Sequence, residues 1–517
     1  PSCIIVGNGR LAVQCANLLL DAGFRIATII SGEKTLIDFA GRNRIQLLDH
    51  PLSCINHPEV DHIFSINNGF ILKKSFTSLA KSHVINYHDA PLPKYAGMFA
   101  THWVLLMDEK EHGVSWHLVT DEIDGGDILA GETLAINPSE TVETLNARCF
   151  EAALRSFSHL LNAIREQRLT PQSQDPSGRS YFGLTARPEH FGSVSGDMTT
   201  EEAVLLLRAT HCGNQLDNEF LLPFFILNNR IFFIHDAKIL KSLTGEAPGS
   251  IVDAGGLKAI VLKDGGLIPV EMTDQQGKKC DPSEILHPGD FIRQPHEKTF
   301  HRITEIFRKT ARHEAFWKSE LEISQFIDWP SFPEAEPGQS FVLKVPKVHI
   351  NRIKSLFPEQ PVEKTLTALL SVFLLKIDGQ SAGSFGFSSS HLPEAIQGAE
   401  LIFNPWIPLN VVLVPEISTL ENIRNLIGQL TIVEKALTFT RSIFARYPSL
   451  REKERNHPGF VIFETIIPEA SLADGLPAIG ICGDELRIVS PVGSSIQGAD
   501  ALANEFLMFM ENFCAHP

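Results

Sequence analysis

The first 184 residues alternate short apolar runs with amphipathic stretches, and this alternation limits the fold more than any other feature of the sequence. Each run has the length of a buried strand, and the stretches between them carry apolar residues at helical spacing. A chain with this order packs its strands into a mostly parallel sheet with helices on its faces. The runs are Ile4–Val6, Ile26–Ile30 and Ile63–Ile66, and the amphipathic stretches are Leu11–Leu20 and Leu36–Ala40.

The length of 517 residues predicts about three domains, because a single hydrophobic core rarely organises so long a chain. A polar, proline-containing segment at 170–178 looks like a linker after the first α/β domain, at 1–184. Short strand-like runs separated by turns follow, which predicts a small β-barrel over 185–298. The remaining residues, 299–517, mix helical and strand patterns and predict an α+β domain with its own core.

Composition excludes several classes of protein. The chain has 61 acidic and 45 basic residues, a formal net charge of −16, so free nucleic acid is not an expected partner. The longest apolar stretch, Leu366 to Ile377, is shorter than the ~20 residues of a spanning helix, and no membrane segment is expected. The opening residues lack a secretory leader pattern, which predicts a cytoplasmic protein. The eight scattered cysteines have no zinc spacing, so we expect reduced thiols and no metal.

One constellation carries chemistry. Asn86 and His88 stand two residues apart at the end of a predicted strand, so both side chains face one side. Asp124 follows within Asp124-Gly125-Gly126-Asp127, where glycines allow a tight turn and a close approach to a ligand. An amide donor, an imidazole and a carboxylate are the groups that acyl transfer to an amine requires. Taken singly, each has a structural explanation, as a turn cap or a buried histidine.

Together with the loop Leu92-Pro93-Lys94-Tyr95-Ala96-Gly97, these residues resemble the signature of the 10-formyltetrahydrofolate-dependent formyltransferases. The resemblance covers residues 1–184 and implies a Rossmann-like catalytic domain. It implies that Asn86 donates to the oxyanion, that His88 stabilises the oxyanion and carries a proton, and that Asp124 orients His88 and acts as base. More weakly, 199–290 resembles the barrel-like (OB-like) C-terminal domain of the methionyl-tRNA members.

The resemblance also implies a folate pocket lined largely by backbone. Its expected contacts come from three loops and are Asn68, Gly69, Phe70, Ile71, Ala90, Pro91, Leu92, Pro93, Thr120, Asp121, Glu122 and Ile123. A separate turn, Gly7-Asn8-Gly9, resembles a dinucleotide fingerprint. The acidic residue expected at the end of the next strand is absent, which argues against NAD.

Two departures bear on the acceptor amine. Members that act on a pentose amine in lipid A modification carry an Arg where this chain has Met98, which puts a sugar nucleotide in doubt. The acidic chain also argues against a tRNA acceptor. The hydrolase domain of formyltetrahydrofolate dehydrogenase carries an aliphatic residue at the position of Asn86, so Asn86 favours transfer over hydrolysis.

The last domain resembles, loosely and in order, the C-terminal half of the condensation domains of nonribosomal peptide synthetases. The resemblance rests on Phe316–Leu321, Thr365–Leu370 and Phe403–Leu409, while the His-His motif of those domains is absent. The alternative is an unrelated α+β domain that packs or forms a homodimer.

The sequence therefore predicts an N-formyltransferase that acts on an amino acid or a carrier-bound aminoacyl group in peptide natural-product biosynthesis, with a peptide carrier protein as partner. The alternatives are a formyltetrahydrofolate hydrolase, a non-catalytic folate-binding scaffold and a sugar N-formyltransferase.

Overall fold

The computed structural model describes residues 1–54, 57–213, 215–243, 245–330, 337–338, 340–455, 457–467, 476–489 and 496–517. Residue contacts group the chain into two compact units, 1–187 with 199–213, and 188–198 with 214–517. The predicted division at 184 and 298 differs from these units in two ways. Helix α6 (Thr200–Thr210) belongs with the first unit, and the two later segments share one unit.

Specific contacts explain why α6 lies with the first unit. Its N-terminus has a capping box formed by Thr199 and Glu202. The Arg208 side chain donates from Nε to the Glu140 carbonyl at 2.8 Å, and His102 Nδ1 bonds the Ala209 carbonyl at 2.7 Å. These contacts join segments about 70 to 110 residues apart, so no local pattern indicates which core the helix joins.

The first unit is built on a seven-stranded sheet in the order β3-β2-β1-β4-β5-β7-β8. The strands from β3 to β5 are parallel, and β7 and β8 are antiparallel to their neighbours. The mostly parallel, Rossmann-like α/β sheet predicted from the sequence is therefore confirmed. The strands are β1 (Ser2–Gly7), β2 (Arg25–Ile30), β3 (Gln46–Leu48), β4 (Val60–Ile66), β5 (Ala80–His88), β7 (Glu111–Leu118) and β8 (Ile128–Ala135).

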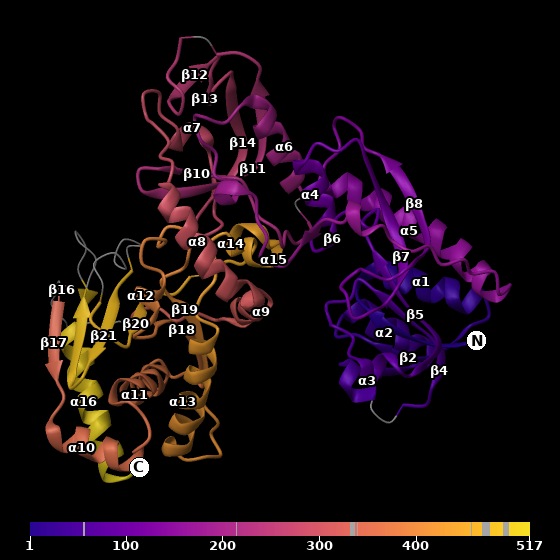
Figure 1. Cartoon of the computed structure of the whole chain (residues 1–517). Coiled ribbons are helices and arrows are strands. Elements are labelled where there is room, and N and C mark those ends of the chain that lie inside the picture. The colour runs from indigo at the N-terminus through magenta and orange to yellow at the C-terminus, as the bar shows by residue number, and fades with distance from the viewer. Residues whose placement is uncertain are drawn as a thin grey trace. The chain divides into compact units, whose positions relative to one another are not determined.

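Both faces of this sheet are covered, so its central strands β1 and β4 are buried at nearly every position. On one face Phe64 packs edge-on against Phe157, with ring centroids 5.5 Å apart. On the other face Ile4 and Val6 share a core with Phe76. Figure 1 shows the helices around the sheet, among them α1 (Gly9–Asp21), α2 (Lys34–Asn43), α3 (Lys74–Thr77), α4 (Ala100–Leu106) and α5 (Val142–Arg165).

The second unit contains two further sheets. An antiparallel sheet has the order β10-β11-β14-β13-β12, with β15 paired to β14. Its strands are β10 (Phe224–Leu227), β11 (Arg230–Leu240), β12 (Ile251–Ala254), β13 (Leu257–Val261), β14 (Gly266–Asp274) and β15 (Lys279–Cys280).

A mixed sheet follows in the order β17-β22-β21-β20-β18-β19. Three helices contact it, namely α11 (Val362–Ile377), α13 (Thr419–Lys435) and α16 (Ala499–Ala515) (Figure 1). Its strands are β17 (Ser340–Lys344), β18 (Ala382–Ser388), β19 (Ile407–Val412), β20 (Val461–Phe463), β21 (Ala478–Cys482) and β22 (Glu485–Val489).

The two sheets of this unit are joined by buried contacts. Ala445, on α14 (Ile443–Arg446), packs in one core cluster with Phe224 and Phe233 of the antiparallel sheet. The buried guanidinium of Arg446 donates to the Asn218 carbonyl at 2.8 Å and to both Glu314 oxygens, at 2.8 and 2.6 Å. The segments predicted as separate domains are therefore held together by apolar packing and by a paired buried charge.

Among the helices that the structure describes, none is long and apolar enough to cross a membrane.

Candidate functional site

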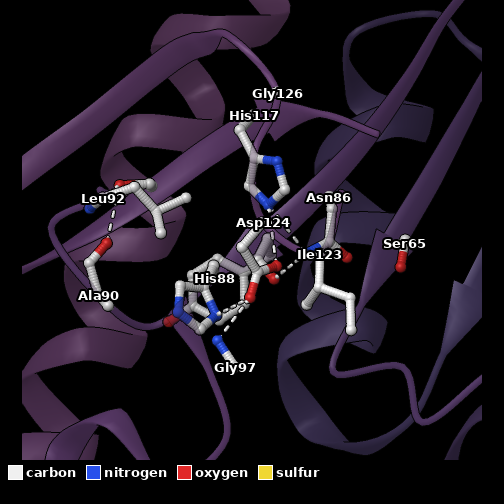
Figure 2. A network of polar contacts seen from close by, with 12 residues as sticks. Ser65, Asn86, His88, Ala90, Leu92, Gly97, His117, Ile123, Asp124 and Gly126 are labelled. Atoms are coloured by element: carbon white, nitrogen blue, oxygen red, sulfur yellow. Dashed lines mark hydrogen bonds and ion pairs between the residues drawn. The ribbon is translucent and has the colours of Figure 1, made fainter. Parts of the chain in front are cut away.

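Strand β5 places Asn86 and His88 on one face of the first sheet, as their spacing predicts. The neighbouring strand β7 runs antiparallel, and its register sets Asn86 opposite His117 and His88 opposite Ser115. Asp124 reaches the same place from the loop after β7. Figure 2 shows these side chains turned toward one another.

The His88 ring is buried and its protonation pattern is fixed by one contact. Nε2 lies 2.8 Å from the backbone carbonyl of Tyr95. Because a carbonyl only accepts, Nε2 carries the hydrogen, and in the neutral ring Nδ1 has the free lone pair. Nδ1 lies 3.8 Å from Asp124 Oδ2 and 3.8 Å from Asp89 Oδ1. The basic nitrogen of His88 therefore faces two carboxylates.

Asp124 is held in place as a carboxylate. Its Oδ2 accepts the Gly97 N–H at 2.8 Å, and its Oδ1 lies 3.4 Å from His117 Nε2. Burial alone would raise its pKa, but the His117 contact, the charge of protonated His88 and the Gly97 N–H outweigh burial and lower the pKa to about 2. Asp124 is therefore ionised at neutral pH.

The turn around Asp124 differs from the one expected. Asp124 itself adopts the left-handed conformation, with φ of 50°, which Asp tolerates better than most residues. Gly125 and Gly126 do not have positive φ. Gly126 is required for a different reason, because a Cβ there would overlap the Leu118 carbonyl oxygen.

His117 is a site residue that the sequence analysis missed. It is 2% exposed, and its Nδ1 bonds the Leu118 carbonyl at 2.9 Å. In the neutral ring Nε2 then accepts from Asn86 Nδ2 at 3.1 Å. Protonation of the ring would direct a second N–H toward Asp124. The signal was a polar residue two positions after Ser115 and so on the same side of β7, but its partners depend on strand register.

The segment predicted as a linker instead supports the catalytic loop. Gln174 Nε2 donates to the carbonyls of Asp124 and Gly126, at 2.8 and 2.6 Å. Arg179 donates to the Ile123 carbonyl at 2.6 Å. The polar residues of this segment predicted a solvated linker. In the structure their side chains instead donate hydrogen bonds to backbone carbonyls of the Asp124 loop, which no strand pairs with.

The three loops expected to contact folate follow the ends of strands β4, β5 and β7. Asn68 closes its own loop, since it accepts the Phe70 N–H at 2.8 Å and donates to the Phe70 carbonyl at 2.9 Å. Phe70 and Ile71 are exposed, at 37% and 82%. Ala90 and Leu92 are buried, so their side chains belong to the core and only their backbone can meet a ligand.

The third expected loop closes with a bond from Thr120 Oγ1 to the Glu122 carbonyl at 3.1 Å. Ile123, 48% exposed, lies beside Asn86 and Asp124 (Figure 2). Gly69, Pro91, Pro93 and Asp121 lie in the same three loops, at residues 67–71, 90–93 and 120–123.

The turn that resembled a dinucleotide fingerprint is filled by the chain's own carboxylate. Glu33 accepts the Gly9 N–H at the start of α1, and the Ser31 hydroxyl donates to Asn8 Oδ1 at 2.9 Å. A helix N-terminus attracts anions, and here Glu33 takes the place that a phosphate would need. Within the described ranges, His, Cys, Asp and Glu form no group of three or more arranged to hold a metal ion.

One stretch of the first unit matches a known protein family. Residues 40–161 match the family model described as formyl transferase, and this range contains Asn86, His88, His117 and Asp124. The chain therefore carries a formyl transferase domain, and the protein is an enzyme of that type.

Three solved structures are among those similar to the chain. An N-formyltransferase from Helicobacter canadensis, in complex with folinic acid and dTDP-3-aminofucose, is 21% identical, with 52% of this chain and 98% of that chain covered and a TM-score of 0.40. HypX from Aquifex aeolicus, in complex with tetrahydrofolic acid, is 14% identical, with 54% and 46% covered and a TM-score of 0.40. A 4-N formyltransferase from Francisella tularensis is 17% identical, with 44% and 93% covered and a TM-score of 0.38.

Proposed function

We propose that this domain transfers the formyl group of 10-formyltetrahydrofolate to a primary amine, with Asn86, His88 and Asp124 as its catalytic residues. The observation that carries the proposal is the orientation of the His88 ring. Its Nε2 is committed to the Tyr95 carbonyl, and its basic Nδ1 faces the ionised Asp124 at 3.8 Å. An imidazole held in this way accepts a proton and is stabilised as imidazolium by the neighbouring carboxylate.

Asn86 supplies an amide N–H for the negative charge that develops on the formyl oxygen. In the free enzyme its Nδ2 donates to the Tyr87 carbonyl at 3.0 Å and to His117 at 3.1 Å. It must give up one of these bonds to reach the formyl oxygen. His88 is the second donor to the oxyanion when its ring is protonated.

Exposed apolar side chains beside the trio suit a planar pterin. Phe70, Ile71 and Ile123 each expose between 37% and 82% of their surface at the loops expected to hold the folate. Bound there, 10-formyltetrahydrofolate supplies the formyl carbon that the amine attacks. The backbone of 90–93 and 120–123 offers the polar contacts that fix its orientation.

We further propose that the acceptor is an amino acid or a carrier-bound aminoacyl group, with a peptide carrier protein as partner. Charge supports this choice over a sugar nucleotide, whose phosphates require free cations. Arg179, which contacts the catalytic loop, is paired with Glu122 at 3.2 Å, and Lys94 is paired with Glu109 at 3.3 Å. The carboxylate of Asp89, 3.8 Å from His88 Nδ1, favours a cationic acceptor.

The test replaces His88 or Asp124 by Ala and follows formyl transfer from 10-formyltetrahydrofolate. Acceptors are free amino acids, an aminoacyl carrier protein, a dTDP-linked amino sugar and water. We expect both variants to lose most turnover while remaining folded, as judged by circular dichroism. His159→Ala, an exposed histidine on α5, is the matched control. Activity within a few-fold of wild type in either variant would refute the proposal, and the preferred acceptor separates the aminoacyl, sugar and hydrolase alternatives.

Folate selection has its own test by thermal shift. A tetrahydrofolate analogue at a hundredfold excess over its dissociation constant should stabilise the folded protein by about 2.7 kcal/mol, because it binds only the folded state. NADH should not, because Glu33 occupies the helix N-terminus that its phosphates would need. A shift with NADH and none with folate would reverse both assignments.

The remainder of the chain is proposed to select the acceptor. The barrel-like character of 185–298 and the condensation-like character of 299–517 rest on the sequence resemblances alone, and a homodimer is the alternative role for the last segment. Binding of remote parts of an acceptor can raise turnover as well as affinity. Loss of acceptor preference without loss of folate binding, in variants of this unit, would support the assignment.

A further inference from the structure

Two carboxylates lie at the same distance from one nitrogen of His88. Asp89 Oδ1 and Asp124 Oδ2 are both 3.8 Å from Nδ1, but their surroundings differ. The Asp124 side chain is 10% exposed, whereas the Asp89 side chain is 39% exposed. A proton on Nδ1 therefore has one carboxylate on its buried side and another open to water.

Asp124 is poorly suited to take that proton. It accepts the Gly97 N–H at 2.8 Å and lies 3.4 Å from His117, and these contacts stabilise its charged form. With a pKa near 2, protonated Asp124 would lie far above the ionised form in free energy at neutral pH. Asp124 stabilises charge on His88 and does not carry the proton away.

The Asp89 side chain is more exposed to water than that of Asp124. In the part of the chain that the structure describes, its side chain accepts no hydrogen bond. His112, Tyr87 and Cys149 lie close enough to feel its charge. Burial lowers the pKa of His112 to about 4 and raises the pKa of Tyr87 and of Cys149, so all three are neutral at pH 7. His102, also near this carboxylate, has its pKa lowered to about 4 by burial. His88 Nδ1, 3.8 Å from Asp89 Oδ1, is therefore the nitrogen from which Asp89 can take a proton.

We propose that Asp89 is a proton-relay residue, which takes the proton from His88 Nδ1 and releases it to water. The inference rests on the proposed formyl transfer. An acceptor amine with a reference pKa near ~8 arrives mainly as ammonium and must lose a proton before it can attack. That proton passes to His88 Nδ1, then to Asp89, then to solvent, which frees the nitrogen lone pair.

The remaining steps, in which bonds form and break at the formyl carbon, do not involve Asp89. The freed lone pair forms the bond between the amine nitrogen and the formyl carbon. The bond between that carbon and the folate nitrogen breaks, and its electron pair stays on the folate nitrogen. The amine's second proton is transferred to that nitrogen, so one proton in all is released to water for each amine formylated.

The test is the full chain with Asp89→Asn, assayed with a primary amine at low and high buffer concentration. We expect kcat/KM at pH 7 to fall about tenfold or more, as for loss of a general base. Imidazole buffer should restore much of it, because Asp89 is open to solvent. The deficit should also shrink as the pH rises above the amine's pKa, where the amine arrives neutral. Asp124→Asn should show neither rescue, and Asp21→Asn, which changes an exposed carboxylate at the end of α1, should match wild type.

Two outcomes would overturn the role of Asp89. One is wild-type activity in Asp89→Asn at low buffer. The other is a deficit that stays constant across pH and buffer, which would indicate a structural effect. Asp89→Glu should retain the relay, and Asp89→Ser replaces Asn if the latter unfolds. Loss of activity in His88→Ala with an unaffected Asp89→Asn would overturn the relay alone, whereas full activity in His88→Ala would overturn the proposed function itself.

Discussion

Nε2 of His117 lies 3.4 Å from Oδ1 of Asp124, across the gap between strand β7 and the loop that follows it. The same nitrogen lies 3.1 Å from the amide of Asn86 on the neighbouring strand. One buried ring thus contacts two of the three residues proposed for catalysis. Its position is set by the antiparallel register of β5 and β7, in which Asn86 pairs with His117.

Replacing His117 should therefore slow formyl transfer while leaving folate binding nearly unchanged. Without the ring, Asn86 and Asp124 each lose a contact that holds them toward the reacting centre. We expect His117→Phe to lower kcat by about 10²-fold, near the effect of losing one oxyanion donor. Steady-state rates and a folate thermal shift measure the two effects. His62→Phe, a buried histidine on β4, is the control, and equal losses in both variants would contradict a role specific to His117.

Neighbouring glycines offer a matched pair for testing the catalytic loop. A Cβ on Gly126 would overlap the Leu118 carbonyl oxygen, so the backbone must move. A Cβ on Gly125 would meet only the end of the flexible, exposed Glu122 side chain. Gly126→Ala should reduce kcat strongly and Gly125→Ala only slightly, because Asp124 precedes both. Similar kinetics for the two variants would show that the loop position does not control the rate.

The ionisation of Asp124 should contribute to the stability of the first unit. Its pKa is lowered from 3.8 to about 2 by folding, which corresponds to about 2 kcal/mol at neutral pH. Because the folded pKa is depressed, this contribution is present above pH 4 and is lost as the pH falls toward 2. Hydrogen exchange of β7 in urea should show wild type more stable than Asp124→Asn at pH 7, with a smaller difference at pH 3. A difference that grows in acid would have the wrong sign.

Arg446 should be essential to the second unit and dispensable for the chemistry. It is 4% exposed and paired with Glu314, so Arg446→Met leaves a buried carboxylate without its cation. Breaking such a pair typically costs ~3–5 kcal/mol. Denaturation should show this loss, while transfer to a small free amine persists because the catalytic trio lies in the other unit. Lys279→Met, which removes an exposed ion pair with Glu271, should cost under about 1 kcal/mol.

The sequence was sufficient for the features that depend on local pattern. Apolar runs separated by amphipathic stretches predicted the parallel strands of the first sheet, because buried strands and amphipathic helices leave periodic signatures. The spacing of Asn86 and His88 predicted that both face one side, because side chains alternate along a strand.

Only the tertiary structure decided the contacts between segments that are distant in the sequence. His117 joins the site through strand register, Gln174 through a segment that folds back on the Asp124 loop, and Glu33 through its bond to the Gly9 N–H. None of these leaves a periodic pattern, because each depends on which backbone groups remain unsatisfied after the sheet has formed. The sequence by itself determined the chemistry available at the end of β5. Tertiary packing determined which carboxylate is buried beside His88 and which is open to water.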